Sequence, residues 1–316
     1  MGDLGVSADG RRVAFWTYPG AEPGVSGVPK STEHRLAIAT ESSPKRWTVS
    51  RGEIWFDGAA VPPLFSASGE RVTTSALLQG KGWVLLQTSG KRERALCEPQ
   101  PTIDTIATSR DGSAVAYVQT KQRGGEGSPI LSAQDGAELY FRGKRVGKKH
   151  ALVDRPAVDA AGEHVAYVIG IEDRRTVAID EEKAPAGRYD HVLELAFDPT
   201  GKRLAFVANV GGAESRDVPG DIEGGKWFVV VRSLLPKGEP DVQASFAEVR
   251  DLTWNEAGDR LAYRAREGQG WRVISGQAQS ELHDEVGRPH FAADGRSLGH
   301  GTRDGRDLWW RVLALE

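Results

Sequence analysis

A short phrase returns seven times along this chain of 316 residues, and its repetition constrains the fold more than any other feature. Each copy contains an apolar residue, three mostly polar residues, a glycine, two further residues, an aliphatic residue and a small residue, as in VSADGRRVA from Val6. The glycines of the phrase are Gly10, Gly69, Gly112, Gly162, Gly201, Gly258 and Gly295. They recur at a period of about 45 residues, which is typical of stacked, structurally equivalent units.

The residues around each of these glycines predict a β-hairpin. Three positions after the glycine stands Val or Leu in all seven copies, followed by Ala, Thr or Gly, and an aromatic residue comes next in five copies. Dipeptides such as Asp-Gly and Ser-Gly between apolar runs favour tight turns, because glycine adopts the positive φ that these turns demand. We therefore expect two antiparallel strands in each phrase, with the small residue placed where neighbouring sheets approach most closely.

Each repeat continues with a third apolar segment and a shorter fourth one. The third segments begin at His34, Trp83, Glu138, Arg175, Lys226, Trp271 and Asp307. Asp190 and Asp284 occupy the same repeat position before the next phrase, where an aspartate can cap a turn by accepting backbone N–H bonds. Seven repeats of four antiparallel strands predict an all-β fold, a seven-bladed β-propeller that forms a single domain over residues 1–316.

The phrase FDPTGKRLAFVA from Phe197, the segment KWFVVV from Lys226 and the pair Tyr189-Asp190 resemble the repeats of the TolB-like and WD-repeat-like bacterial seven-bladed propellers. The resemblance covers essentially the whole chain, and its motifs specify blades rather than chemistry. The second and seventh copies depart from it, with Thr73-Thr74 and Gly299-His300 in place of a small residue followed by an aromatic one. The resemblance implies a platform for binding.

The seventh blade raises a question of completion. The first phrase begins near Met1 and the sequence stops within the third strand of the seventh repeat. Either this blade has three strands, protected by charge and curvature, or the natural protein extends upstream of Met1. An unpaired strand edge at residues 309–315 would also invite another chain to add to it.

The composition of the chain limits the functions and locations that it could have. The net charge is −3 from 41 basic and 44 acidic residues, which argues against binding nucleic acid or membranes over the whole surface. Cys97 is the single cysteine, so no internal disulfide forms and no oxidising compartment is indicated. The first residues have neither the basic nor the apolar region of a signal peptide, and no apolar run is long enough to span a bilayer. We expect a soluble, cytoplasmic protein without membrane insertion, or a periplasmic one if a signal peptide has been removed.

Long connections mark alternate repeats. Gly- and Pro-rich stretches separate the second and third strands of the first, third and fifth repeats, at residues 17–33, 120–137 and 209–225. In a propeller these connections emerge on one face, which favours a binding surface, although tolerated lengthening or an ancestral duplication of two blades would give the same pattern. The candidate partner-binding residues are Trp16, Tyr18, Glu22, Lys30, Lys121, Arg123, Glu126, Glu214, Arg216, Asp217, Asp221 and Glu223.

The turns after the third strands of the second and third repeats carry a candidate basic patch. Its members are Lys91, Arg92, Arg94, Arg142, Lys144, Arg145, Lys148 and Lys149. Such a patch could bind nucleic acid or an acidic partner. It lacks interleaved aromatic residues for stacking on bases, so an ordinary solvated surface or a protein contact is the better interpretation.

Motifs of catalysis are absent from the sequence: there is no GxSxG, P-loop, HExxH or CxxC, and we predict neither catalytic residues nor a cofactor. His283, His290 and His300 crowd into the seventh repeat with Asp284, so a metal site is conceivable. Ordinary strand and turn histidines explain them better, because no ligand spacing recurs. Most tryptophans fall at blade positions and predict inter-sheet packing, whereas Trp16 and Trp47, close to loops, are candidates for exposed contact.

These observations favour a non-enzymatic scaffold that binds another protein through the face with the long connections of blades one, three and five. The alternative is an enzyme, or a propeller that binds a small ligand or a metal in its central channel. The third hypothesis is binding of nucleic acid or an acidic partner through the basic patch.

Overall fold

The computed structural model describes residues 4–17, 35–44, 46–51, 56, 61–78, 80–90, 92–120, 136–183, 187–215, 221–234, 241–242 and 245–315. Over these residues the chain is all-β, with strands β1 to β28 and no α-helix. None of the described residues belongs to a helix that could cross a membrane. The fold divides into two compact units, Met1–Val165 and Ala166–Glu316, and each unit is described by itself. That they form one domain stays a prediction.

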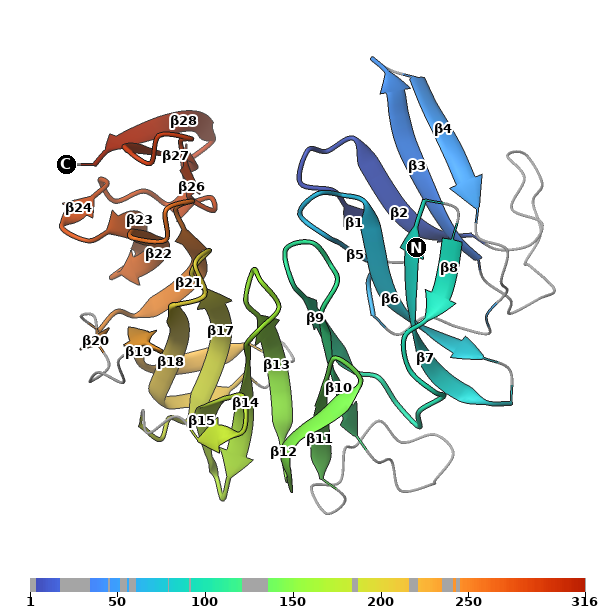
Figure 1. Ribbon diagram of the computed structural model, residues 1–316. Coiled ribbons are helices and arrows are strands. Elements are labelled where there is room, and N and C mark those ends of the chain that lie inside the picture. Colours follow the sequence, from blue (N-terminus) through green and yellow to red (C-terminus); the bar gives the residue numbers. More distant parts are fainter. Residues whose placement is uncertain are drawn as a thin grey trace. The chain divides into compact units, whose positions relative to one another are not determined.

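The amino-terminal unit contains three four-stranded antiparallel sheets (Figure 1). Sheet 1 consists of β1 (Gly5–Val6), β2 (Arg12–Thr17), β3 (Arg35–Ser43) and β4 (Arg46–Arg51). Sheet 2 consists of β5 (Leu64–Phe65), β6 (Arg71–Leu78), β7 (Gly82–Ser89) and β8 (Arg92–Ala95). Sheet 3 consists of β9 (Thr105–Thr108), β10 (Val115–Thr120), β11 (Ala137–Phe141) and β12 (Lys144–His150). Each sheet follows the order of the sequence, as the repeat predicted.

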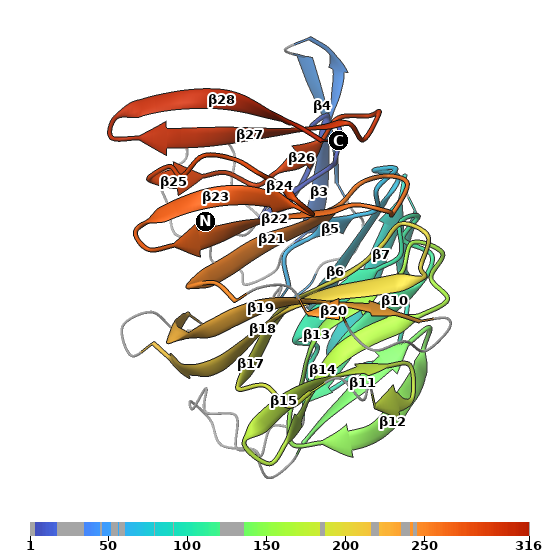
Figure 2. The same cartoon turned by 90° about the vertical axis from the view of Figure 1, so that its left-hand side faces the viewer.

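Three further sheets have the same order. Sheet 4 consists of β13 (Val153–Val158), β14 (Val165–Ile171), β15 (Arg174–Ile179) and β16 (Glu182–Lys183), and the boundary between the units falls at the start of β14. Sheet 5 consists of β17 (His191–Phe197), β18 (Arg203–Glu214), β19 (Ile222–Ser233) and β20 (Asp241–Val242). Sheet 6 consists of β21 (Glu248–Trp254), β22 (Leu261–Glu267), β23 (Gly270–Ser275) and β24 (Ala278–Gln279). Figure 2 shows sheets 5, 6 and 7 stacked in succession within the carboxy-terminal unit.

Sheet 7 is arranged differently. Its strands are β25 (Glu285–Val286), β26 (His290–Phe291), β27 (Ser297–Asp304) and β28 (Asp307–Ala314). Both short strands, β25 and β26, pair with one edge of β27, and β28 pairs with the other edge. The sheet is therefore three strands wide, one of the arrangements that the sequence left open. Among the described residues, β28 pairs with β27 alone.

The seven phrases form the predicted turns. All seven glycines have a φ between 66° and 71°, the left-handed region that glycine adopts without strain. The sequence analysis missed a second feature: the residue after the first apolar position accepts a backbone N–H bond from the residue five places later, closing the turn. In six phrases a buried Ser, Asp or Asn does this, namely Ser7, Ser66, Ser109, Asp159, Asp198 and Asn255.

The small residue of the phrase lies between sheets, as expected. Ala14, Ala205 and Ala262 are fully buried. Ala205 belongs to a core cluster in which Val207 and Val229 of sheet 5 pack against residues of sheet 6. A larger side chain here would separate the two sheets, because protein interiors are close-packed.

The prediction that Trp16 is exposed is wrong. The side chain is 8% exposed and its ring meets the edge of Phe56 at a centroid distance of 6.0 Å. Trp16 lies two residues after Ala14 on β2, so alternation along the strand turns both residues to the same buried face. Trp47 is exposed, but it lies on β4 rather than in a loop.

Candidate functional site

The described part of the third long connection, residues 209–215 and 221–225, is a two-stranded ribbon rather than the loop that its glycines suggested. β18 and β19 continue to pair with each other past Asn209, the last residue of β18 that pairs with β17. The further pairs include Val210↔Lys226, Gly212↔Gly224 and Glu214↔Ile222. We call residues 209–215 and 221–226 the ribbon. Its backbone groups are satisfied by cross-strand hydrogen bonds, so the segment is an ordered extension of the sheet.

A buried asparagine fixes a bend at the base of the ribbon. Asn209 is 0% exposed. Its Nδ2 donates to the carbonyl of Gly224 at 3.0 Å, and its Oδ1 accepts the N–H of Gly212 at 2.9 Å. Gly211, Gly224 and Gly225 have φ values of 83°, 72° and 74°. A Cβ at Gly212 would lie 2.3 Å from Asn209 Oδ1, so the bend requires glycine there.

Asp190 supports the same bend from the connection before β17. Its Oδ2 accepts the N–H of Gly211 at 2.6 Å, and its Oδ1 lies 2.7 Å from Arg174 Nη1. Asp284, at the same repeat position, accepts the N–H of Gly305 at 2.6 Å. The prediction that both aspartates accept backbone N–H bonds is confirmed; Asp284 caps the turn between β27 and β28, whereas the partner of Asp190 lies within β18.

Three of the predicted partner-binding residues lie at the outer end of the ribbon, where the register places Asp221 and Glu223 on one face and Glu214 on the other. Glu214 and Glu223 are exposed, and Asp221 is bound by Arg250 of β21, with an Nη2–Oδ1 distance of 3.1 Å. Ser215 donates a hydrogen bond to Glu223. Among the other candidates Trp16 is buried, and eight lie outside the described residues: Tyr18, Glu22, Lys30, Lys121, Arg123, Glu126, Arg216 and Asp217.

The candidate basic patch lies on the outer edge strands of two sheets. Lys91 is outside the described residues; the exposed members are Arg92, Arg94, Arg142, Lys144, Arg145, Lys148 and Lys149. Three of them have local contacts. Arg94 donates to Gln87 at 2.9 Å, Arg145 lies 3.2 Å from Glu138, and the guanidinium of Arg142 lies 5.5 Å from the centre of the Phe141 ring. Lysines on edge strands also hinder pairing with other chains, so the patch has a structural explanation.

The histidines of the seventh repeat separate into two kinds. His290 is exposed on β26. His283 and His300 are buried, and His283 Nδ1 lies 2.8 Å from Asp304 Oδ2. Within the described ranges, no three His, Cys, Asp or Glu side chains are grouped so that they could hold a metal ion.

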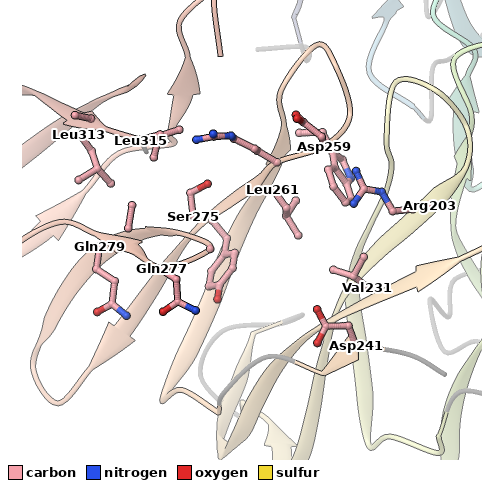
Figure 3. A pocket seen from close by; sticks show the side chains of 16 residues that line it. Arg203, Val231, Asp241, Asp259, Leu261, Ser275, Gln277, Gln279, Leu313 and Leu315 are labelled. Carbon is pink, nitrogen blue, oxygen red and sulfur yellow. The ribbon is translucent and has the colours of Figure 1, made fainter. Parts of the chain in front are cut away.

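A cavity of about 700 Å³ opens in the carboxy-terminal unit (Figure 3). Val231 and Asp241 of sheet 5 lie on one side, Leu313 and Leu315 at the end of sheet 7 lie on the other, and Ser275 of sheet 6 lies between them. No sequence motif marked it, because its lining comes from three separate repeats.

Two groups give this cavity its chemistry. Arg203 covers the face of Trp254, with 4.7 Å between the guanidinium carbon and the ring centre. Burial, with the charge of Asp241 as a smaller contribution, raises the pKa of Tyr263 to about 12. The phenol therefore stays protonated at neutral pH and can donate a hydrogen bond.

Comparison with solved structures establishes the fold. A eukaryotic initiation factor structure matches with a TM-score of 0.55 and 10% identity, over 99% of this chain and 79% of that one. An oligogalacturonate lyase in complex with manganese matches with a TM-score of 0.54 and 10% identity, over 100% of this chain and 96% of that one. TolB from Acinetobacter baumannii covers 98% of this chain and 56% of its own, with a TM-score of 0.39 and 13% identity.

The chain thus has the fold of the seven-bladed β-propellers, as its repeats predicted. No family model and no curated protein matches it. At these identities the likeness concerns the fold alone, and fold does not determine function.

Proposed function

We propose that the protein is a non-catalytic scaffold that binds a partner protein through the surface that carries the ribbon. The observation on which the proposal depends is the bend at Asn209, which holds a projecting two-stranded extension in one conformation. An ordered extension loses little conformational entropy when a partner binds, so more of the contact energy appears as affinity. The propeller structures that resemble this chain include an enzyme and an initiation factor, so the fold by itself favours neither class.

The proposed surface extends over the face that carries the long connections of blades one, three and five. Within the described residues, the fifth blade supplies Glu214, which is exposed, together with Asp221 and Glu223, whose carboxylates are bound by Arg250 and by Ser215. Charged groups fixed in this way favour the selection of one partner over another. We propose no cofactor for this activity.

The test is site-specific photocrosslinking in the natural host. A photoreactive residue at Glu214 should crosslink to a discrete partner protein, and the same residue at Ala257, in the exposed turn between β21 and β22 at the opposite ends of the strands, should not. Replacing residues 211–224 with a two-residue turn should abolish capture of that partner while sheet 5 stays folded, because Arg203–Val210 remains paired with Lys226–Ser233. Capture that is equal with and without the ribbon would refute the proposal.

The cavity of Figure 3 favours a second candidate, a protein that binds a small ligand. Its size suits a small molecule, and its lining is divided about evenly between polar and apolar surface. A ligand that raises the melting temperature of the wild type but not of Tyr263→Phe would support this candidate. Under the scaffold proposal, Tyr263→Phe captures the partner as well as the wild type does.

We also propose a cytoplasmic location. Cys97 is half-buried, its Sγ accepts the N–H of Leu85 at 3.3 Å, and burial raises the pKa of its thiol. A thiol in this state is a packing group rather than a reactive one.

A further inference from the structure

Residues in three successive connections join neighbouring sheets of the carboxy-terminal unit. Tyr189, Phe246 and His283 each form a two-bond backbone bridge with the first part of the preceding sheet's third strand. The partners are Arg175, Trp227 and Trp271, and the N–O distances lie between 2.7 and 3.1 Å. Each connecting residue is therefore fixed by its backbone to one sheet just before the chain enters the next.

The side chains of these residues pack on the sheet that follows. The ring of Tyr189 meets Phe206 of β18 with centroids 5.8 Å apart, and that of Phe246 meets Tyr263 of β22 with centroids 5.9 Å apart, both edge to face. Phe206 and Tyr263 hold the aromatic position of the repeated phrase, and His300 of β27 holds it in the seventh copy. At the junction of sheets 6 and 7, histidine thus replaces both members of an aromatic pair.

The two histidines have different surroundings. His283 Nδ1 makes a hydrogen bond with Asp304 Oδ2 at 2.8 Å. His300 is 1% exposed, and neither of its ring nitrogens makes a hydrogen bond in the part of the chain that the structure describes. The ionisable groups that face His300 are His283 from the connection and Arg311, its register partner on β28.

We propose that the contact of sheet 7 with sheet 6 is a pH-sensitive latch, in which protonation of His300 loosens β27 and β28 under mildly acidic conditions. At neutral pH His300 packs as an uncharged ring, like Tyr263 one sheet earlier. When the ring gains a proton it becomes a buried cation beside Arg311 and His283, with no carboxylate in contact with it. A buried charge without a partner is strongly destabilising.

The pKa of His300 supports this direction. Burial and then the nearness of His283 lower the pKa below its usual value of 6.5; the backbone of Leu298 acts in the opposite direction and Arg311 lowers the pKa further, so the net change is downward. The unfolded or opened state therefore binds the proton more readily, and the latch weakens as the pH falls below about 6.5. The equivalent contacts, where sheet 4 meets sheet 5 and where sheet 5 meets sheet 6, have tyrosine and phenylalanine in place of histidine. They do not titrate in this range, because burial raises the pKa of Tyr189 and brings that of Tyr263 to about 12.

The apolar contact that the latch would release lies on one side of sheet 7. Leu298 of β27 and Val286 of β25 are buried against Ala262 and Val273 of sheet 6, and Leu313 of β28 packs at the margin of this cluster. Loss of this contact exposes backbone hydrogen bonds of β27 and β28 to solvent. The loss can therefore be measured as faster amide hydrogen exchange in these two strands.

The test is amide hydrogen exchange on the full chain at pH 7.5 and pH 5.5, with rates corrected for the intrinsic effect of pH. In the wild type, protection of β27 and β28 should fall between the two conditions, by at most about tenfold, because each pH unit below the ordinary histidine pKa favours protonation of the opened state by a factor of ten. Protection of β18 and β19 should not change. His300→Tyr, which restores the residue type of Tyr263, should keep β27 and β28 protected at pH 5.5.

His290→Tyr is the matched control, because His290 is an exposed histidine in the same sheet, and this variant should behave as the wild type does. If His300→Tyr does not fold, His300→Phe reproduces the residue type of Phe206. Equal protection of the wild type at both pH values, or an equal loss in the wild type and the His300 variant, would overturn the proposal.

Discussion

Glu194 and Asp251 are joined across sheets 5 and 6: one carboxylate oxygen of Glu194 accepts the N–H of Asp251 at 2.9 Å, and the other accepts that of Leu252 at 3.0 Å. The pairing of β21 with β22 is interrupted between Arg250 and Thr253, and Asp251 has a φ of 61°. A bulge of this kind leaves backbone donors without a cross-strand partner. The carboxylate of the preceding sheet satisfies them.

We expect Glu194→Ala to lower the free energy of unfolding by about 2 to 3 kcal/mol, because two backbone donors lose a charged acceptor. Glu194→Gln should lose less, since its carbonyl oxygen still accepts one bond. Urea denaturation measures both changes. The control is Glu281→Ala, at an exposed position. Equal effects of the two alanine variants would mean that the carboxylate does not hold the bulge.

A second prediction concerns the turn of the third phrase. The backbone N–H of Ser113, followed by the hydroxyls of Ser113 and Ser109, lowers the pKa of Asp111 to about 2. Because the folded pKa lies below the unfolded value of 3.8, this stabilisation is present above pH 3.8 and is lost as the pH falls toward 2. Asp111 is largely exposed to solvent, so the effect is small.

The urea midpoint should therefore fall less between pH 5 and pH 3 in Asp111→Asn than in the wild type. Asp294→Asn is a useful comparison, because Asp294 stands at the same place of the seventh phrase, where Ala292 provides no hydroxyl. An identical pH dependence of Asp111→Asn and the wild type would contradict the assignment.

The turns could be predicted from the sequence because their requirement is local. Gly258 needs a positive φ, and the Asp-Gly or Ala-Gly step shows this without knowledge of any distant residue. The nearness of Trp16 to a loop suggests exposure, but its place on the same face of its strand as Ala14 buries it. The glycines of the ribbon suggest a flexible loop, whereas the pairing of Glu214 with Ile222 depends on the register of two separated strands.

The features between sheets could not be predicted in this way. Glu194 reaches the bulge in the next sheet, and no pattern in the sequence connects it with Asp251. The sequence shows that His283 and His300 lie close together in the seventh repeat and that His300 stands at the aromatic position of the phrase, but the equivalence of His283 to Phe246 requires the bridges that align the connections. Contacts of this kind come from the stacking of one sheet on the next, which a repeat predicts only in outline.

A third prediction tests the bend of the ribbon. Gly212→Ala should lower the free energy of unfolding by about 1 to 3 kcal/mol, the usual range for an added methyl group without room. The new Cβ would meet Asn209 Oδ1 and the Cγ2 of Ile222. Exchange of the ribbon amides should accelerate, while those of β22 and β23 keep their rates.

A double variant separates this clash from a general weakening. Asn209→Ala removes the atom that the new methyl group meets, so Gly212→Ala should cost less in that background than in the wild type. Double-mutant cycles measure this difference directly. Additive effects of the two substitutions would show that Gly212 and Asn209 act independently.

A fourth prediction concerns the edge of sheet 3. β12 is the last strand of its sheet in the described structure, and Lys148 and Lys149 stand exposed on it. Lysines at such an edge oppose pairing with a strand of another molecule. Replacing both with valine, a residue with high β propensity, should promote association that increases with protein concentration, measured by light scattering.

Lys202→Val, in a turn of sheet 5, is the control and should leave the protein monodisperse. If the double variant stays as monodisperse as the control, the lysines do not protect the edge. The edge would then not explain the basic patch, which would favour its use as a binding surface.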